Sequence, residues 1–392
     1  MIDILYKSLS FLTYPIAQKR LIDSDLEKDS IWFHAASLGE VTSIKPLLDY
    51  FDKKGVPFYV TTMTESGKKR ADEYFKGRVF LFPYDNPLLI KKLVDRTRLL
   101  VLAESEFWPN TIFEVKKNKK NLILVNGRIS EKSFLRWKLL KGYFARILSC
   151  FDKFFVISFR EKKFLRRFNV DGSKIFVSGN LKILFENKDV SLLFEKPFDF
   201  TITFASVRTG EFSGIVDVIE KIMKMNEKIG FIIAVRHLES LILLENILKL
   251  KKIKYVKFSE ERENFKYRAR VLILDTLGDL IRVFPISDVA VVCGTFAPYG
   301  GHNLLEPAQF GVPVFFGPYT FNVKGMEEIL IKEGGGIKCK DFNDLFTIFK
   351  DMIDSRDELI KVGKNSKNAY EKARKISENG FRKIVEYIEK NL

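Results

Sequence analysis

The stretch VVCGTFAPYGGHNLLEPAQFGVPVFFG, residues 291–317, holds a glycine-rich turn between two short apolar runs. These runs, residues 289–293 and 312–316, have the length and the β-branched or aromatic side chains that are typical of buried parallel strands. Asn303 is placed to cap a helix that follows the glycines. The stretch predicts a βαβ unit whose helix N-terminus points N–H groups at the carboxyl edge of a sheet, where open α/β sheets bind ligands, anions in particular.

Several side chains that could bind a ligand occur in this one turn. Glu306 falls in the first turn of the expected helix, where a carboxylate can accept hydrogen bonds from the two vicinal hydroxyls of a ribose. A simpler interpretation is that Glu306 only complements the helix dipole and that the glycines only make a turn. The presence of Gly300, Gly301, His302 and Asn303 beside it favours a ligand site.

The sequence GGHNLLEPAQFGVPVFFGPYTFN, residues 300–322, resembles the nucleotide-sugar-binding motif of the Kdo transferases of lipopolysaccharide synthesis. Those enzymes move 3-deoxy-D-manno-oct-2-ulosonic acid (Kdo) from CMP-Kdo to a lipid A precursor, and they have the two-domain B-type glycosyltransferase fold. The resemblance implies that Glu306 holds the ribose of CMP-Kdo and that Asn303 belongs to the phosphate loop. It implies neither a metal ion nor a cofactor.

Length and composition bound the class of protein. A chain of 392 residues suits two domains of roughly 180 residues each, and 46% apolar with 14% aromatic residues can fill sizeable cores. The three cysteines, Cys150, Cys293 and Cys339, lack paired spacing, which favours a reducing compartment and argues against a metal cluster.

Positive charge is concentrated in the first half of the chain. Residues 1–185 hold 34 Lys and Arg against 20 Asp and Glu, whereas residues 186–392 hold 32 against 30. The first half is therefore expected to meet a polyanion, such as nucleic acid, an acidic membrane surface or a phosphorylated lipid. Aromatic residues interleave with the cations between residues 116 and 167, a mixture that also stacks on RNA. We favour acceptor and membrane binding, because an RNA-binding protein would leave GGHNLLEP without a role.

The first 22 residues predict an amphipathic helix. Its apolar stripe has spacings of three and four residues and consists of Ile2, Leu5, Leu9, Leu12 and Ile16. Asp3 and Lys7 interrupt the run, which is too short to span a bilayer. We expect a helix that lies on an anionic membrane surface, and a helix packed on the protein's own core is the alternative.

Alternation of apolar runs with helical patterns predicts a parallel sheet in each half. The expected strands are residues 31–36, 58–62, 79–82, 99–102, 122–125, 153–157 and 175–177 in the first half, and 200–205, 231–235, 272–274, 289–293 and 312–316 in the second.

Candidate catalytic carboxylates follow two strands of the first half. Glu40 ends HAASLGE, residues 34–40, at a strand-to-helix turn, where it could simply serve the helix dipole. Glu104 and Glu106 begin ESEFWPN, residues 104–110, where surface acids are the simpler interpretation. Both stretches resemble motifs of the Kdo transferases, and the resemblance implies that Glu40 is the general base.

Acceptor-binding candidates come from the same motifs and from two others. TMTESG, residues 62–67, and NGRIS, residues 126–130, also resemble the family's pattern. The acceptor-binding candidates are Ser37, Gly39, Thr62, Thr64 and Arg128.

Further donor-binding candidates follow two strands of the second half. Ser206 and Arg208 come after residues 200–205, and Arg236 and His237 come after residues 231–235. Hydroxyl and guanidinium groups at such turns can hold a phosphate. His34, His237 and His302, the chain's three histidines, all lie at expected strand ends that carry site candidates.

Together these features predict two Rossmann-like, doubly wound α/β domains that face a central cleft. The expected parts are a membrane-associating helix (1–22), an acceptor-binding domain (23–185), a linker (184–198), a nucleotide-sugar-binding domain (199–375) and a C-terminal helix that crosses back (376–392). The expected enzyme is an inverting Kdo transferase at the cytoplasmic face of the bacterial inner membrane, with CMP-Kdo and a lipid A precursor as its partners and no nucleic acid. A B-type glycosyltransferase that uses a UDP- or GDP-sugar is the alternative.

Overall fold

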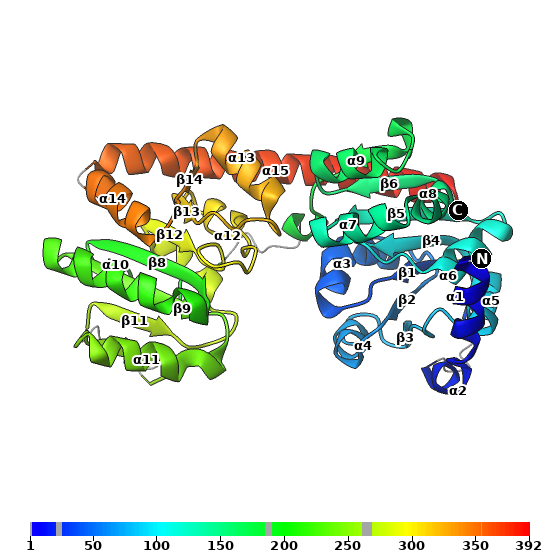
Figure 1. The fold of residues 1–392 in the computed structure, drawn as a ribbon, viewed down its shortest axis with the longest axis horizontal. Coiled ribbons are helices and arrows are strands. Elements are labelled where there is room, and N and C mark those ends of the chain that lie inside the picture. The colour runs from blue at the N-terminus through cyan, green and yellow to red at the C-terminus, as the bar shows by residue number, and fades with distance from the viewer. Residues whose placement is uncertain (1, 21–25, 185–189, 261–268, 354) are drawn as a thin grey trace. The chain divides into compact units, whose positions relative to one another are not determined.

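The computed structural model describes residues 2–20, 26–184, 190–260, 269–353 and 355–392. The chain forms two compact units, the first made of Met1–Glu186 with Arg374–Leu392 and the second of Asn187–Ala373. Each unit is a parallel sheet covered by helices (Figure 1), so the predicted α/β class is confirmed. Among the described residues, none of the helices is long enough and apolar enough to cross a membrane.

The first unit contains a seven-stranded parallel sheet in the order β3-β2-β1-β4-β5-β6-β7. Its strands are β1 (Ser30–His34), β2 (Phe58–Thr62), β3 (Val79–Leu81), β4 (Thr97–Ala103), β5 (Asn121–Gly127), β6 (Lys153–Val156) and β7 (Ile175–Val177). Its helices are α1 (Ile2–Phe11), α2 (Tyr14–Ala17), α3 (Leu38–Lys53), α4 (Glu65–Asp72), α5 (Pro87–Arg96), α6 (Pro109–Lys117), α7 (Glu131–Leu139), α8 (Lys141–Ser149) and α9 (Phe159–Arg166).

Alternate residues of these strands build two different cores, because successive side chains point to opposite faces of a sheet. Trp32 and Leu100 pack with α5, α6, α8 and α9 on one face. Ile31 and Val101 pack with α3 and with the end of the chain on the other. Both faces are apolar, which explains why the strands read as continuous hydrophobic runs.

The second unit contains another seven-stranded parallel sheet, in the order β10-β11-β9-β8-β12-β13-β14. Its strands are β8 (Phe200–Val207), β9 (Ile229–Val235), β10 (Tyr255–Lys257), β11 (Val271–Leu274), β12 (Val289–Val292), β13 (Val314–Phe316) and β14 (Gly336–Lys338). Its helices are α10 (Phe212–Met225), α11 (Leu241–Leu250), α12 (Leu305–Ala308), α13 (Lys324–Glu333), α14 (Phe342–Ile353) and the first part of α15 (Arg356–Lys390).

The two outer strands β10 and β14 were not predicted. Their residues are half-buried or exposed, and β14 consists of glycine, isoleucine and lysine. Neither segment therefore shows an apolar run. They form strands because they pair with the edges of an existing sheet, and this pairing leaves no pattern in the sequence.

Each sheet has a topological switch point beside its first strand. In the first unit the chain runs from β1 to β2 on one side and reaches β4 on the other. In the second unit β8 is flanked by β9 and β12 in the same way. The loops that follow two neighbouring strands diverge at such a point and leave a crevice at the carboxyl edge, where ligands of open α/β sheets bind.

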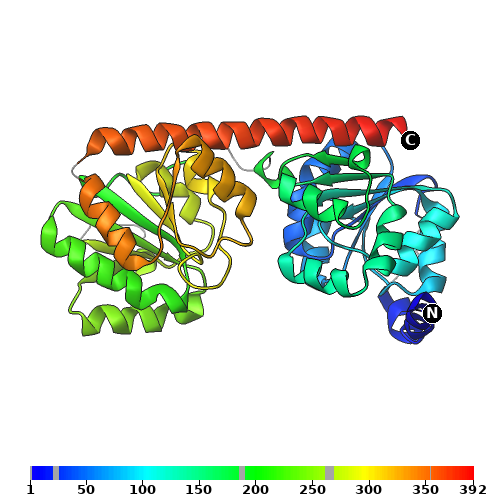
Figure 2. The ribbon, with the colours of Figure 1, turned by 45° about the horizontal axis from the view of Figure 1, so that its top comes forward.

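The C-terminal helix belongs to both units. The sequence predicts a C-terminal helix at residues 376–392 that crosses back to the first domain. These residues are the last part of α15, which runs without interruption from Arg356 to Lys390 (Figure 2). Leu359 near its start packs in the core of the second unit. Ile384, Val385 and Ile388 near its end are buried in the core of the first unit.

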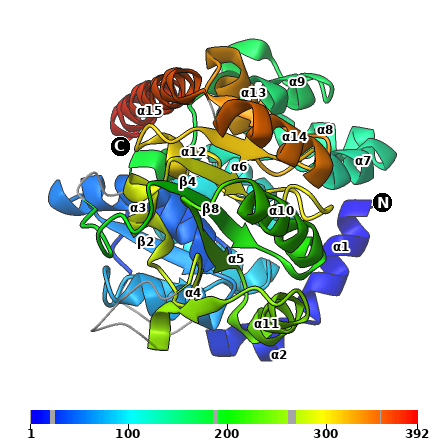
Figure 3. The ribbon, with the colours of Figure 1, turned by 90° about the vertical axis from the view of Figure 1, so that its left-hand side faces the viewer.

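The N-terminal segment is not the single helix that its periodicity predicts. α1 ends at Phe11, α2 begins at Tyr14, and a 3₁₀ turn covers Gln18–Arg20. The hydroxyl of Tyr6 donates to Asp85 at 3.1 Å, so the polar side of α1 docks on the first unit. Figures 1 and 3 show α1 on the outside of that unit, and Figure 1 shows α5 as its neighbour.

The apolar stripe of this segment faces away from the protein. Leu5, Leu9, Leu12 and Ile16 are between 56% and 76% exposed. Ile2, also part of the predicted stripe, lies outside the side chains that the structure describes. The alternative of a helix packed by its apolar side on the protein's own core is therefore wrong for these four residues.

The aromatic residues among the cations of the first half are mostly core residues. Phe134, Trp137 and Phe164 are buried, and the rings of Phe134 and Phe164 stack with centroids 4.5 Å apart. The buried rings of Phe134, Trp137 and Phe164 therefore cannot act as the stacking platform that an RNA-binding interpretation requires. By contrast, Leu135 and Leu139 of α7 are exposed, at 60% and 84%.

The predicted linker, residues 184–198, is only partly independent of the second unit. Residues 185–189 lie outside the described residues, while Leu193 and Phe194 pack against a core cluster of the second unit.

Candidate functional site

The three candidate carboxylates of the first unit lie at its switch point. Glu40 is in the first turn of α3, directly after β1, while Glu104 and Glu106 follow β4. β1 and β4 are hydrogen-bonded neighbours, so their carboxyl ends adjoin. The negative charges of Glu106 and Glu104 both act on the pKa of Glu40, which places the three groups in one electrostatic cluster.

Glu40 is held by the turn that precedes its own helix. Its carboxylate accepts the N–H of Ala36 at 2.9 Å and the hydroxyl of Ser37 at 3.2 Å. Ser37 is the N-cap of α3 and in return accepts the N–H of Glu40 at 3.4 Å. This reciprocal arrangement is close to a capping box, so the structural role considered for Glu40 is present.

The pKa of the Glu40 carboxyl is in the range that suits a general base. Burial, followed by repulsion from Glu106 and Glu104, raises the pKa of its carboxyl from 4.5 to about 7, against the opposing hydrogen bonds from Ala36 and Ser37. A carboxylate with a pKa near the working pH accepts a proton effectively, and a substantial fraction of it is ionised and able to act as a base.

Glu104 occupies a backbone conformation that only a few non-glycine residues adopt. Its φ of 51° lies in the left-handed region, and its N–H and carbonyl bond to Val125 and Arg128. Burial raises the pKa of its carboxyl, whereas the positive charges of Arg128 and Lys182 lower it. Local strain of this kind is concentrated at functional sites.

Glu106 is part of a buried polar chain that reaches into the sheet. The indole of Trp108 donates to Glu106 at 2.8 Å and lies 3.0 Å from Nε2 of His34. The other ring nitrogen of His34 lies 2.9 Å from the hydroxyl of Thr61. His34 is completely buried, and its Nε2 is 3.6 Å from the Glu106 carboxylate.

Two partners of the carboxylates lay within the recognised motifs but were not proposed as site residues. His34 opens HAASLGE and Trp108 belongs to ESEFWPN. Their positions in those motifs are the signal by which the sequence could identify them. The contact between them is not visible in the sequence, because it depends on the pairing of β1 with β4.

The acceptor candidates of the first unit occupy different environments. Ser37 and Thr64 are N-cap residues of α3 and α4, and Gly39 is exposed. Thr62 is completely buried and its hydroxyl donates to the carbonyl of Ala36 at 3.0 Å, so it supports the turn that precedes Glu40. Arg128 is half-buried and its positive charge acts on Glu104.

In the second unit, a cluster of two arginines and two histidines lies at the ends of three neighbouring strands. Arg208 follows β8, Arg236 and His237 follow β9, and His302 comes from the loop after β12. The side chain of Arg208 lies over the ring of Tyr299 at 4.8 Å, and its Nε donates to Nε2 of His302 at 3.4 Å. This cluster is suited to an anion.

His302 is the neutral member of that cluster. Burial, followed by repulsion from Arg236, Arg208 and His237, lowers its pKa from 6.5 to about 4. The arginines therefore supply the positive charge at neutral pH, and His302 serves as a hydrogen-bonding group.

The glycines of the loop after β12 are required by close contacts. Gly294, Gly300 and Gly301 have φ values of 72°, 94° and 89°. A Cβ on Gly294 would lie 2.8 Å from the ring of His302, and one on Gly300 would lie 2.3 Å from Asn322. Side chains at these positions would displace the residues that border the cluster.

Asn303 and Glu306 are adjacent, but the helix between them differs from the prediction. α12 begins at Leu305, and the capping position falls on Leu304, which supplies no capping side chain. Asn303 instead accepts the N–H of Leu305 at 3.1 Å and donates to Glu306 at 3.2 Å. A four-residue helix has a small dipole, so the arginines contribute more to an anion site than the predicted helix N-terminus does.

Ser206 lies at a bulge in β8. Its φ of 57° is left-handed, and the register with β9 shifts between Phe204 and Val207. Such a bulge re-aims the residues that follow it, here towards the carboxyl edge.

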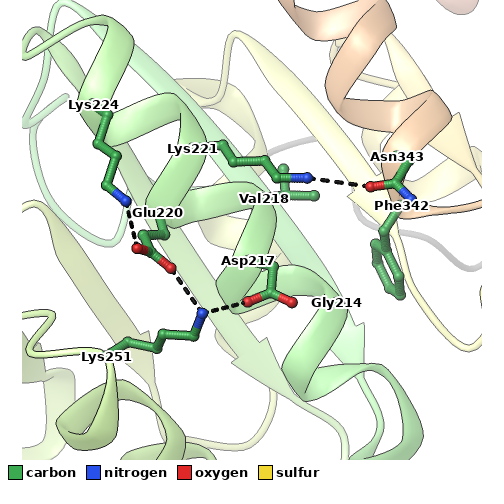
Figure 4. A pocket seen from close by; sticks show the side chains of 9 residues that line it. All are labelled: Gly214, Asp217, Val218, Glu220, Lys221, Lys224, Lys251, Phe342 and Asn343. Atoms are coloured by element: carbon green, nitrogen blue, oxygen red, sulfur yellow. Dashed lines mark hydrogen bonds and ion pairs between the residues drawn. The ribbon is translucent and has the colours of Figure 1, made fainter.

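An open cavity of about 380 Å³ elsewhere in the second unit is not lined by any predicted site residue (Figure 4). It lies along α10, α11 and α14, where Lys251 pairs with Asp217 and Glu220 at 2.9 Å each. Exposed ion pairs of this type contribute little stability.

Two doubly wound units, each built on a seven-stranded parallel sheet, define the class of B-type glycosyltransferase folds. A putative UDP-N-acetylglucosamine 2-epimerase from Listeria monocytogenes has a similar fold, with a TM-score of 0.62, 14% identity, and 88% of this chain and 94% of that chain covered.

Sequence relatives define the family within this class. A family model described as 3-deoxy-D-manno-octulosonic-acid transferase matches residues 13–185. The 3-deoxy-D-manno-octulosonic acid transferase of Aquifex aeolicus is 31% identical, over 87% of this chain and 90% of the relative. A bifunctional glycosyltransferase/methyltransferase of Fusobacterium nucleatum is 32% identical over 82% of this chain, which spans about half (52%) of that longer protein. The chain belongs to the 3-deoxy-D-manno-octulosonic acid transferase family and is a glycosyltransferase.

Proposed function

We propose that this protein transfers Kdo from CMP-Kdo to a lipid A precursor, with inversion at the anomeric carbon and with Glu40 as the general base. The observation that carries the proposal is the position of Glu40 at the switch point of the first unit, with its carboxyl pKa raised to about 7 beside two further carboxylates. Membership of the family supplies the substrates.

In the proposed reaction, Glu40 takes the proton of the acceptor hydroxyl while that oxygen attacks the anomeric carbon of Kdo. The bond between this carbon and the phosphate oxygen of CMP breaks, and its electron pair leaves with CMP. The charge on the departing phosphate is stabilised by Arg208 and Arg236. Fixed cations and N–H groups act in this way without having to reorganise.

The remaining donor candidates have roles around the same phosphate and nucleoside. Glu306 accepts the ribose hydroxyls, and Asn303 holds Glu306 in place through its hydrogen bond at 3.2 Å. Gly300 and Gly301 let the nucleotide approach the backbone. Ser206, His237 and His302 add hydrogen-bonding groups near the phosphate.

The acceptor is assigned to the first unit. Ser37, Gly39, Thr64 and Arg128 lie in segments that follow strands of this unit, and they offer hydroxyl, N–H and guanidinium groups to a phosphorylated sugar. Thr62 acts through the turn that it supports. Glu104 and Glu106 tune the basicity of Glu40 and contact the acceptor.

A membrane surface is the proposed location of the acceptor. The exposed stripe of Leu5, Leu9, Leu12 and Ile16 inserts between anionic headgroups at the cytoplasmic face of the inner membrane. Leu135 and Leu139 of α7 form a second exposed apolar pair beside the exposed Arg136 and Lys138. Apolar groups flanked by cations are the combination that binds anionic lipid.

The test is transfer by purified protein, read by mass spectrometry of a lipid A precursor incubated with CMP-Kdo. One or more mass increments of a Kdo residue are expected. Parallel reactions with UDP- and GDP-sugars examine the alternative donors. Transfer from one of those donors, with none from CMP-Kdo, would overturn the proposal.

A further inference from the structure

Glu211 is a completely buried carboxylate that none of the recognised roles uses. It ends the 3₁₀ turn Thr209–Glu211, between β8 and α10. Its Oε2 accepts the N–H of Gly294 at 2.8 Å and that of Arg208 at 3.1 Å. Its Oε1 accepts the N–H of Phe296 at 3.0 Å.

These N–H groups come from two different loops. Arg208 belongs to the turn after β8, whereas Gly294 and Phe296 belong to the glycine loop after β12. A single side chain therefore joins the two loops whose ends carry the cationic cluster. Because N–H groups bond to both oxygens of the carboxylate, both oxygens are needed.

The two loops are also packed closely where Glu211 joins them. A Cβ on Gly210 would lie 3.1 Å from the hydroxyl of Tyr299. The guanidinium of Arg208 lies over that Tyr299 ring at 4.8 Å and reaches His302 on the same loop. A shift of either loop would therefore change the position of the Arg208 guanidinium relative to His302.

The charge of Glu211 suits a positioning role rather than contact with a ligand. Burial raises the pKa of its carboxyl, while the hydrogen bonds from Gly294, Phe296 and Arg208 lower it. The carboxylate is shielded from solvent, and a phosphate approaching the arginines would not meet it directly. The hydrogen bonds between this buried carboxylate and several N–H groups instead hold the backbone of the two loops in place.

We propose that Glu211 is a positioning residue of the donor site, which locks the Arg208 turn to the glycine loop so that both bind the phosphate of CMP together. The inference rests on the proposed function, because it assigns the cationic cluster to that phosphate. It predicts that Glu211 contributes to recognition of the phosphate and not of the nucleoside.

The test compares CMP with cytidine, which lacks the phosphate, on full-length Glu211→Gln. Glutamine keeps the size of the side chain, but its NH₂ group would face an N–H that now bonds to an oxygen, so one loop is released. CMP affinity is expected to fall about 10- to 100-fold, the usual effect of losing a buried charged hydrogen bond, while cytidine affinity stays within about twofold. Isothermal titration and competitive displacement measure both ligands.

Glu245→Gln is the matched control. Glu245 is also a buried glutamate of the second unit, but it lies on α11 and pairs with Lys257 at 3.4 Å. This variant is expected to bind CMP and cytidine as the wild type does. If Glu211→Gln does not fold, Glu211→Asp replaces it, because the shorter side chain cannot reach both loops.

Three results separate the possibilities. A selective loss of CMP affinity supports the inference. An equal loss for CMP and cytidine, or no loss for either, overturns the positioning role while leaving the donor site in place. A wild-type protein that binds CMP no better than cytidine overturns the proposed phosphate site and the inference with it.

Discussion

At the scale of single residues, Glu40 combines two roles that oppose each other. Its bonds to Ala36 and Ser37 close the first turn of α3, which stabilises the fold. Its burial beside Glu106 and Glu104 raises its pKa to about 7, which costs stability whenever it is ionised. A group that is kept at such a cost is a strong candidate for catalysis.

Glu40→Gln is expected to lower turnover by about two to four orders of magnitude, because the amide keeps the shape of the side chain and its oxygen can still accept the Ala36 N–H, but it cannot accept a proton. CMP affinity, measured by titration, should not change. Wild-type activity should fall as the pH decreases below about 7, where the carboxyl becomes protonated.

Single-turnover rates of Glu104→Gln and Glu106→Gln at saturating acceptor provide the comparison. These two variants are expected to affect mainly the apparent KM or the thermal stability. Near-normal turnover of Glu40→Gln, together with loss of activity in either neighbour, would show that the base has been assigned to the wrong residue.

Glu40→Gln is also expected to stabilise the protein at alkaline pH. Because the folded-state pKa of about 7 lies above the ordinary value of 4.5, the contribution of Glu40 to stability is present below pH 4.5 and is lost as the pH rises through 7. At pH 8, Glu40→Gln should therefore melt several degrees higher than wild type, and the difference should disappear near pH 4.5. Calorimetry at both pH values checks this, and a lower melting temperature at pH 8 would contradict it.

At the scale of elements, the N-terminal segment reverses the usual arrangement of an amphipathic helix. Its hydroxyl-bearing side docks through Tyr6 onto the buried Asp85, and the leucine stripe is left in solvent. Asp85 also accepts the N–H groups of Asn110 and Thr111 at 2.9 and 2.8 Å, at the start of α6. The docked orientation of α1 is thus fixed by polar contacts, and its apolar side remains available for a lipid surface.

Replacing Leu9 and Leu12 by aspartate should release the protein from vesicles that contain anionic lipid, because it places charge in the apolar stripe. Co-sedimentation with such vesicles is the measurement. Leu250→Asp is the matched control, since Leu250 is 83% exposed on the second unit. Equal binding of the double variant and the wild type would contradict the interfacial role of the stripe.

At the scale of the whole molecule, the two units share one helix. α15 begins in the second unit, and its last turns complete the core of the first, where Ile384 and Ile388 are fully buried. The first unit therefore contains residues that are far apart in the sequence, and its stability depends on Arg374–Leu392.

Ile388→Ala is expected to destabilise the first unit by about 2–5 kcal/mol, the usual cost of truncating a fully buried isoleucine. Hydrogen exchange of β1 and β4 measures this unit separately from the other. Ile376→Ala, at a position of the same helix that is 42% exposed, should have little effect. Similar destabilisation by both variants would mean that the end of α15 does not complete this core.

The sequence by itself determined the fold class and the family, and it located the candidate site residues at the strand ends. Apolar runs alternating with helical patterns were sufficient because parallel strands buried on both faces leave a strong local signal. The carboxylates and glycines could be located because they immediately follow such strands. The short edge strands β10 and β14 left no comparable signal.

Only the tertiary structure decided which of these groups meet. The order of the strands brought His34 and Trp108 to Glu106, buried the hydroxyl of Thr62, and placed Glu211 between the loops that follow β8 and β12. The leucines of the N-terminal segment face outwards in the folded protein. Periodicity along the chain shows which face of an element is apolar, whereas the neighbours of that face depend on contacts between residues far apart in the sequence.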